Sequence, residues 1–240
     1  MKIRIGIMGA MPEEIEGLVP HVHNKVENIF GQRKYTTGTL SGVEVVVVFS
    51  RWGKVAAAST AATLIHKFQI THLLFSGVAG ALSSKLNLAD VVIAENLIQH
   101  DLDARPFMPK FEIPLLGKTQ IQTNSKLNRV MENVCQSLQF NYHKGLVASG
   151  DQFFQSNEQK EAVTQAFPQV LCVEMEGAAV AQVCFEHEIP FSVIRIISDT
   201  ANESAAHDFQ EFIRNVSAVK LDQIILETIN KLGADSSFIQ

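Results

Sequence analysis

The chain has 240 residues, 46% of them hydrophobic, which is enough for one large globular domain with a well-filled core. Its net charge of -5 argues against a protein that binds nucleic acid or an anionic membrane surface. No uncharged run reaches the roughly 20 residues of a membrane-spanning helix, and the apolar part of MKIRIGIMGAM is too short for a signal peptide. Three cysteines without paired spacing indicate reduced thiols, so we expect a soluble, cytoplasmic protein.

Apolar, β-branched runs alternate with helical patterns along the chain, which is typical of a largely parallel sheet covered by helices. In chain order, the alternating segments are KIRIGIMG and PEEIEGLV, KVAAASTAATLIHKF and THLLFSG, GLVAS and NEQKEAVTQAF, and VLCVEM and EGAAVAQVCFEH. Residues 33–40 and 43–50 flank Ser41 and Gly42, a two-residue turn that predicts an antiparallel hairpin. The expected fold class is α/β, with a central mixed β-sheet flanked by helices.

Two segments depart from this alternation. Residues 100–120 are rich in proline, and their apolar residues follow neither the helical nor the strand period. They predict a long loop, and loops of this length are usually functional. Apolar residues at helical spacing, Phe209 among them, predict a helix from Asp208 to Leu232, and GADSSFIQ follows it. Without a repeat or a linker in the sequence, we expect a single domain over residues 1–233 and a flexible tail over residues 234–240.

Charged residues interrupt the apolar stretch from Leu171 to Asp199. They are Glu174, Glu176, Arg195 and Asp199. A buried, unpaired charge is costly, so this group predicts mutual pairing, a ligand, or both. Asp199 follows the run SVIRIIS, where a central strand would end, and open α/β sheets gather their chemistry at the carboxyl ends of strands.

The first strand ends in GAMPEEI, which places Glu13, Glu14 and Glu16 in the first turn of the next helix. Acids are favoured at helix N-termini and Pro12 suits the first helical position, so this explanation needs no function. One acid could still point back over the sheet edge while the others face water.

Two further strand ends carry candidate ligand-binding residues. In SGVAGAL, Gly77 and Gly80 allow close backbone approach to a ligand, although turn glycines alone are a weak signal. In SGDQFF, Phe153 and Phe154 could stack on a base, although core packing is the usual explanation for such aromatics.

Common cofactor and nucleophile motifs are missing from the sequence. There is no GxGxxG after the first strand, no GxxxxGK(S/T) and no GxSxG. HDLD, at His100 to Asp103, could supply metal ligands, but no second cluster accompanies it, so we expect no metal and no cofactor. Carboxylates and one arginine suit proton transfer better than covalent catalysis.

Taken together, GAMPEEI, SGVAG, ASGDQFF, VEMEGAA and RIISD resemble the 5'-methylthioadenosine/S-adenosylhomocysteine nucleosidases in their order and spacing. The match covers nearly the whole chain. The resemblance implies a nucleoside phosphorylase-like fold, a homodimer, and hydrolysis of the bond between adenine and a 5'-thioribose.

The resemblance also implies roles for individual residues. Glu14 would activate water, Asp199 would protonate the purine, and Glu176 would bind the ribose 2' and 3' hydroxyls. Supporting, adenine-binding and apolar pocket residues would be Arg195, Glu174, Phe154, Phe153, Met11, Met175, Phe209, Val78, Ala79, Gly80 and Ser198. Phe107 would belong to the 5' pocket, in a 100–120 loop at or near the dimer interface.

This sequence departs from the commonest family pattern at three positions. Val78 stands where many members have serine, Trp52 replaces a smaller aliphatic residue, and Ala104 replaces a valine. The chemistry is unaffected, but the 5' substituent is left open among methylthioadenosine, S-adenosylhomocysteine, 5'-deoxyadenosine and aminofutalosine.

Two other functions compete with hydrolysis. A purine nucleoside phosphorylase would use phosphate as nucleophile, but Glu13 and Glu14 would repel an anion and Val78 lacks a hydroxyl. A non-catalytic nucleoside-binding protein would not need an acid and a base on separate strands. For hydrolysis, the apolar strand before Asp199 favours the protonated acid that adenine needs to leave.

Overall fold

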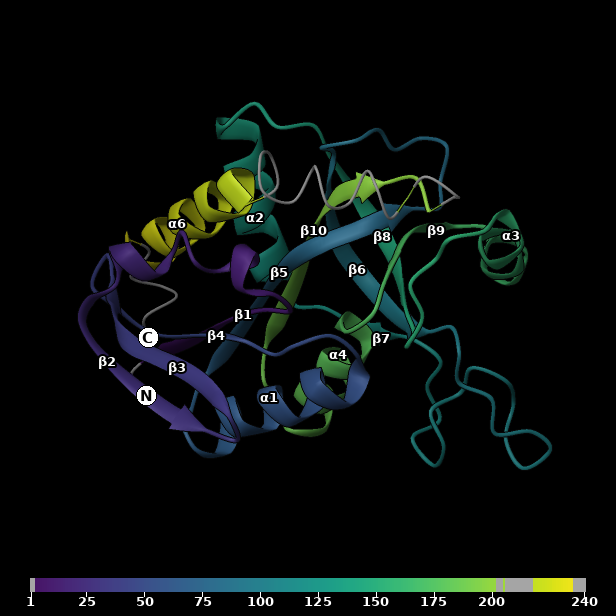
Figure 1. Ribbon diagram of the computed structural model, residues 1–240, viewed down its shortest axis with the longest axis horizontal. Coiled ribbons are helices and arrows are strands. Elements are labelled where there is room, and N and C mark those ends of the chain that lie inside the picture. The colour runs from purple at the N-terminus through teal and green to yellow at the C-terminus, as the bar shows by residue number, and fades with distance from the viewer. Residues whose placement is uncertain (1–2, 202–204, 206–217, 235–240) are drawn as a thin grey trace.

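The computed structural model describes residues 3–201, 205 and 218–234 (Figure 1). Within them one mixed sheet of ten strands contains β1 (Arg4–Gly9), β2 (His23–Phe30), β3 (Arg33–Leu40), β4 (Val43–Phe49), β5 (His72–Ala81), β6 (Val91–Gln99), β7 (Ile121–Gln122), β8 (Tyr142–Ser149), β9 (Val170–Glu174) and β10 (Phe191–Asp199). The helices are the short 3-10 turns η1 (Pro12–Glu14) and η2 (Val19–His21), and α1 (Lys54–His66), α2 (Ser125–Ser137), α3 (Asn157–Ala166), α4 (Gly177–Glu186) and α6 (Ala218–Ala234).

The sheet closes on itself at one end. Its strand order is β10-β6-β8-β9-β5-β1-β4-β3-β2, with β7 paired to β6 beside this path. Because β10 also pairs with β5, the strands β5, β10, β6, β8 and β9 form a ring. β10 runs parallel to β5 and its end pairs Asp199 with Gly80. β9 runs antiparallel to β5 and pairs Val173 with the same Gly80. The carboxyl ends of β5, β9 and β10 therefore lie together.

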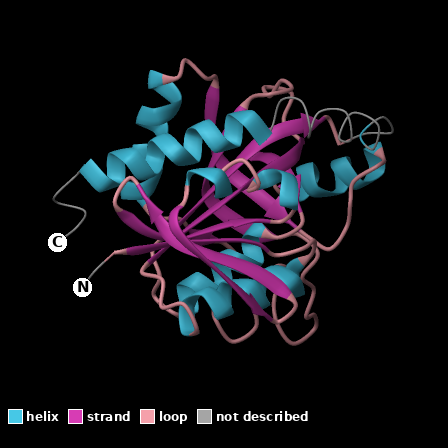
Figure 2. Cartoon of the chain, turned by 60° about the vertical axis from the view of Figure 1, so that its left-hand side comes forward, coloured by secondary structure: helices cyan, strands magenta, loops and turns pink. Residues whose placement is uncertain are grey.

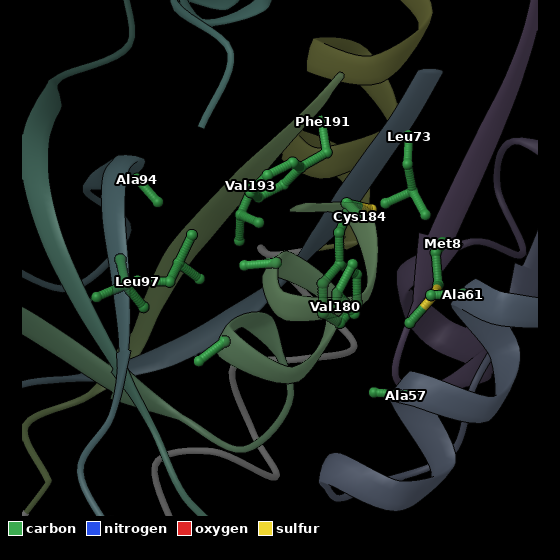
Figure 3. Packing of buried hydrophobic residues seen from close by; sticks show 14 of the residues in the cluster. Met8, Ala57, Ala61, Leu73, Ala94, Leu97, Val180, Cys184, Phe191 and Val193 are labelled. Carbon is green, nitrogen blue, oxygen red and sulfur yellow. The ribbon is translucent and has the colours of Figure 1, made fainter. Parts of the chain in front are cut away.

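Helices cover both faces of the sheet (Figure 2). α1 and α4 pack on one face, which buries Val46 and Val48 of β4, whereas α2 and α6 pack on the other, which buries Val45 and Val47. This alternation is the two-residue period of a strand. Figure 3 shows part of the first cluster, with Val180 and neighbouring residues of α4 against the sheet. Each fully buried valine or leucine contributes roughly 1.5–3 kcal/mol to folding.

The structure confirms the expected α/β class and mixed sheet flanked by helices. The β3–β4 hairpin has the predicted turn, because Ser41 and Gly42 both have positive φ angles, of 47° and 80°, as a two-residue hairpin turn requires. Residues 100–120 contain no described helix or strand apart from an isolated bridge between Ile113 and Lys118. None of the helices described is long and apolar enough to cross a membrane.

Two predicted elements differ in the structure. The segment PEEIEGLV is not an α-helix: it contains the 3-10 turn η1 and ends at the first residue of the 3-10 turn η2, whose Pro20 has no N–H for an α-helical hydrogen bond. At the other end, α6 extends two residues beyond Leu232, where the predicted helix ends, and so includes Ala234, the first residue of the predicted tail. Gly233 packs closely against the Ser41 carbonyl, so the end of α6 rests on the β3–β4 turn. Residues 208–217 of the predicted helix, Phe209 among them, lie outside the described residues.

Candidate active site

A pocket opens where the ends of β1, β5, β9 and β10 meet. It holds about 720 Å³ of empty space, including solvent at its mouth, which suits a small molecule. The predicted site residues in its lining are Met11, Glu14, Trp52, Val78, Ala79, Gly80, Phe153, Phe154, Glu174, Met175, Glu176, Ser198 and Asp199. The sequence analysis did not select the other lining residues, which are Ala10, Gln152, Val173 and Ala201. Ala10, Gln152 and Val173 do lie within the quoted motifs GAMPEEI, SGDQFF and VEMEGAA.

Glu14 is the acid of the first loop that turns back over the sheet. Its carboxylate accepts hydrogen bonds from the backbone N–H groups of Ala10 (2.5 Å), Met11 (3.0 Å) and Val78 (3.1 Å). Burial raises its pKa, even though Arg195 and the three amides lower it. Glu13 is only partly buried and Glu16 is exposed, so Glu14 alone of the three reaches the pocket.

Gly77 allows this approach. A Cβ at this position would lie 2.9 Å from Glu14 Oε1 and 3.3 Å from Arg195 Nη1. Any side chain there would press on both charged groups, so β5 needs a glycine where it passes them.

Glu174 and Arg195 form a buried ion pair beneath the pocket. Arg195 Nη2 donates to Glu174 Oε2 at 2.6 Å, and the side chains are 1% and 3% exposed. Glu174 also accepts from the N–H of Glu176 (3.1 Å) and of Gly177 (2.7 Å), at the N-terminus of α4 where a negative charge is favoured. Burial lowers the Arg195 pKa, but Glu174, Glu14 and Glu176 outweigh it, so the guanidinium stays charged. The predicted pairing of these charges is therefore present.

Glu176 follows at the start of α4 and faces the pocket. Its Oε1 accepts a hydrogen bond of 2.7 Å from the N–H of Gly53, just before α1. Burial and the nearby Glu174 carboxylate raise its pKa, while the Gly53 amide and Arg195 lower it. A buried carboxylate in this position can accept hydrogen bonds from hydroxyl groups of a ligand.

Asp199 ends β10 and lines the pocket. Its Oδ1 accepts from the N–H of Ala201 and its Oδ2 from the hydroxyl of Ser198, each at 2.8 Å, and the residue is 3% exposed. The pairing of β10 with β5 shifts register between Ile197 and Asp199, and such irregularities commonly re-aim a side chain next to a site.

Apolar side chains form the remaining walls. Met11 and Val78 pack together, and Phe154 is buried with its ring edge-on to His100 at 5.2 Å between ring centroids. Trp52 lines the pocket while 60% exposed, which places it at the mouth. The pocket thus combines flat apolar walls with a few convergent carboxylates, an arrangement suited to a base and a sugar.

Of the predicted site residues that the structure describes, two do not line the pocket. Arg195 lies beneath the pocket and acts on it through Glu174 and Glu14. Phe107 is 89% exposed and does not line the pocket. Among the described lining residues there is no lysine or arginine, so no cation faces a bound ligand there.

Comparison with known proteins decides the family. The model of the phosphorylase superfamily matches residues 4–230. A 5'-methylthioadenosine/S-adenosylhomocysteine nucleosidase from Staphylococcus aureus is 37% identical over 229 residues, which cover 95% of this chain and 100% of the relative. The chain belongs to this nucleosidase family.

Solved structures of similar proteins agree with this membership. A family structure from S. pneumoniae, with the transition-state inhibitor MT-ImmA, has a TM-score of 0.90 and 37% identity, covering 96% of this chain and 100% of that one. A futalosine hydrolase of Helicobacter pylori strain 26695 has a TM-score of 0.91 and 35% identity, covering 97% and 99% of the two chains. The nucleosidase family fold predicted from the motifs is therefore confirmed.

Proposed function

We propose that this protein hydrolyses the N-glycosidic bond of 5'-substituted adenosines, releasing adenine and the 5'-substituted ribose. The observation that carries the proposal is one pocket lined by two buried carboxylates, Glu14 and Asp199, from strand ends far apart in the sequence. Membership of the nucleosidase family supports the same reaction.

Asp199 supplies the proton that the departing adenine needs. Adenine leaves poorly as an anion, so the N-ribosyl bond breaks readily only when a purine ring nitrogen is protonated. A well-placed general acid contributes roughly 10²- to 10⁴-fold to the rate. The buried carboxyl of Asp199 can give this proton and then accept hydrogen bonds as a carboxylate.

Glu176 and Glu14 act on the sugar and the water. As the bond opens, the ribose gains oxocarbenium character, and nearby carboxylates stabilise that positive charge. Glu176 binds the ribose 2' and 3' hydroxyls, and Glu14 takes a proton from the attacking water as its oxygen bonds to the anomeric carbon. The pairing of Arg195 with Glu174 holds this acidic group together.

Phosphate is a poor nucleophile for this pocket. A phosphorylase needs cations and hydroxyl donors for an anion, whereas Glu14 is at the pocket and Arg195 is already paired with Glu174. The N–H of Val78, which an anion could have used, donates to Glu14 instead. These contacts favour water.

A product assay separates the three candidate functions. Purified protein is incubated with 5'-methylthioadenosine, with and without inorganic phosphate, and adenine and the sugar product are measured. Hydrolysis predicts phosphate-independent release of adenine and free methylthioribose. A phosphate requirement with a ribose 1-phosphate product would establish a phosphorylase, and binding without adenine release would establish a nucleoside-binding protein.

The family relatives set the range of substrates to compare. The S. aureus relative is a methylthioadenosine/S-adenosylhomocysteine nucleosidase and the H. pylori neighbour is a futalosine hydrolase. We propose four candidate substrates for this protein: methylthioadenosine, S-adenosylhomocysteine, 5'-deoxyadenosine and aminofutalosine. Measured values of kcat/KM rank them. We also propose a cytoplasmic homodimer whose 100–120 loop lies at or near the interface.

A further inference from the structure

The N-terminus of α1 is held by carboxylates from two distant parts of the chain. The N–H of Gly53 donates to Glu176 Oε1, and the N–H of Lys54 donates to Asp151 Oδ1, both at 2.7 Å. The first N–H groups of a helix have no partner within the helix, so each needs such an acceptor. The orientation of α1 and the position of Glu176 are therefore linked through one backbone amide.

A ring of hydrogen bonds fixes this helix terminus. The Lys54 ammonium donates to Asp101 Oδ1 at 2.6 Å, and Asp101 Oδ2 accepts from the N–H of Asp151 at 3.0 Å. Asp151 in turn accepts from the N–H of Lys54. Lys54 thus joins the start of the 100–120 loop to the SGDQFF turn, and its ammonium also donates to Gln99 at 3.1 Å.

The ion pair between Lys54 and Asp101 is largely buried, so it can hold the start of α1 in place. The side chains of Lys54 and Asp101 are only 18% and 21% exposed, so their ion pair is less screened than a surface pair. Burial raises the pKa of Asp101, but the hydrogen bonds from Lys54 and from the Asp151 amide outweigh it, so its pKa is lowered and it stays charged.

The backbone conformation at Gly53 requires a glycine. Its φ of 92° is a conformation that only glycine adopts without strain, and a Cβ there would lie 3.0 Å from Asp151 Oδ1. The consecutive N–H groups of Gly53 and Lys54 donate to Glu176 and Asp151, so the two carboxylates together fix the orientation of adjacent peptide units. Trp52, at the pocket mouth, precedes it in the chain.

We propose that Lys54 is a positioning residue for substrate binding: through Asp101 and Asp151 it holds the Gly53 amide on Glu176, and so aims Glu176 at the ribose hydroxyls. The inference rests on the proposed function in taking Glu176 as the ribose-binding acid. It assigns specificity for the sugar hydroxyls to a lysine that does not itself line the pocket.

The test compares substrates with and without a ribose hydroxyl. Wild type, Lys54→Met and Lys54→Arg are assayed on 5'-methylthioadenosine and on its 3'-deoxy analogue. A group misplaced by about 1 Å can cost up to 10²-fold, so we expect Lys54→Met to lose about tenfold in kcat/KM on 5'-methylthioadenosine, mainly through KM. It should lose far less on the 3'-deoxy analogue, and Lys54→Arg should recover most of the loss.

A matched control separates positioning from folding. Lys34 also forms an ion pair, with Glu27 at 3.1 Å, but on the exposed β2–β3 edge, so Lys34→Met should leave both substrates unaffected. Thermal unfolding of each variant reports its stability. If Lys54→Met loses the same factor on both substrates, or keeps the full wild-type preference for the 3' hydroxyl, the positioning role is wrong.

Nucleoside binding tests the positioning role of Lys54 even if the protein does not catalyse the proposed reaction. Should the wild type release no adenine, adenosine and 3'-deoxyadenosine are titrated into wild type and Lys54→Met by calorimetry. A preference for adenosine in the wild type that shrinks in Lys54→Met supports the positioning role without catalysis. Equal preference in both proteins, or no preference in the wild type, overturns it.

Discussion

Asp199 and Glu14 have different tasks in the proposed reaction, so their removal should be distinguishable. Asp199→Asn keeps the shape of the side chain but cannot protonate adenine, and we expect kcat to fall by roughly 10²- to 10⁴-fold. Nucleoside binding, measured by calorimetry, should remain within a few-fold of wild type. The control is Asp222→Asn, which alters an acid outside the pocket lining. An Asp199→Asn variant with near-normal turnover would remove Asp199 as the acid.

The environment of Glu14 predicts the acid side of the pH profile. Burial raises its pKa above the ordinary value of 4.5, and a general base works only when ionised. On the acid side of the profile, activity should therefore fall as pH drops through this raised pKa, so the acid limb of kcat lies above pH 4.5. Burial also raises the pKa of Glu176, so protonation of this ribose-binding acid at low pH should raise KM. A kcat limb centred at or below pH 4.5, with the fold intact by circular dichroism, contradicts this.

Trp52 should control the size of the 5' substituent. Its ring stands at the pocket mouth where a smaller aliphatic residue would leave more room. Trp52→Ile should raise kcat/KM for S-adenosylhomocysteine relative to methylthioadenosine by about tenfold, the scale of a change in an apolar pocket. Val55→Ala is the control, since Val55 is 82% exposed and outside the pocket lining. An unchanged substrate ranking would show that Trp52 does not limit the pocket.

At the scale of elements, the site depends on strand ends that sit on a helix-covered sheet. β5 contributes Val78 to Gly80, and β10 contributes Asp199, while α4 begins at the acid that binds the ribose in the proposed mechanism. The three are rigid elements with buried faces, which is how a site keeps its geometry. Small changes in the packing of these elements should therefore lower catalytic activity even where the protein remains folded.

The contact of α6 with the η1 region contains a titratable group that predicts a pH-dependent stability. Asp222 packs against Gly17, and no hydrogen bond to its Oδ1 occurs within the described part of the chain. Burial raises the pKa of Asp222 to about 6. The folded state therefore binds this proton more tightly than the unfolded state. The resulting stabilisation is complete below about pH 4 and is lost as pH rises through 6.

Asp222→Asn removes this titration. The variant should unfold with a free energy about 1–3 kcal/mol above wild type at pH 8, and with a much smaller difference at pH 4.5. Urea unfolding at both pH values measures the two differences. Equal differences at the two pH values would mean that the Asp222 carboxyl does not titrate with folding.

At the scale of the whole molecule, the exposed apolar residues of the 100–120 loop support the proposed dimer. Phe107 and Leu115 are 89% and 94% exposed in one chain, and large apolar side chains gathered on a surface loop mark interaction sites. If the loop completes the 5' pocket of a second copy, Phe107→Ser should weaken the dimer and raise KM for methylthioadenosine several-fold. Sedimentation velocity and kinetics on the same samples test both effects. A variant that stays dimeric with normal KM contradicts this role.

Much of this molecule is determined by local sequence. The β3–β4 hairpin follows from Ser41 and Gly42, because a two-residue turn restricts its own backbone. The helix-strand alternation follows from periodicity, and the cost of isolated buried charge predicts that the charges between Leu171 and Asp199 pair with one another, bind a ligand, or both. Each of these depends on residues close in the chain or on a rule of solvation, so the sequence alone suffices.

The family resemblance selects Glu14 and Asp199, but from residue types and local patterns alone only the tertiary structure decides which charges share the pocket. Glu13, Glu14 and Glu16 are alike in sequence, and only Glu14 meets the Val78 amide, 64 positions away on β5. The closure of β10 onto β5 brings Asp199 to the same pocket. Local propensities carry no information about such long-range contacts, because these contacts form only when the sheet buries its apolar faces. The acidic stretch from Leu171 to Asp199 becomes a site only after that burial.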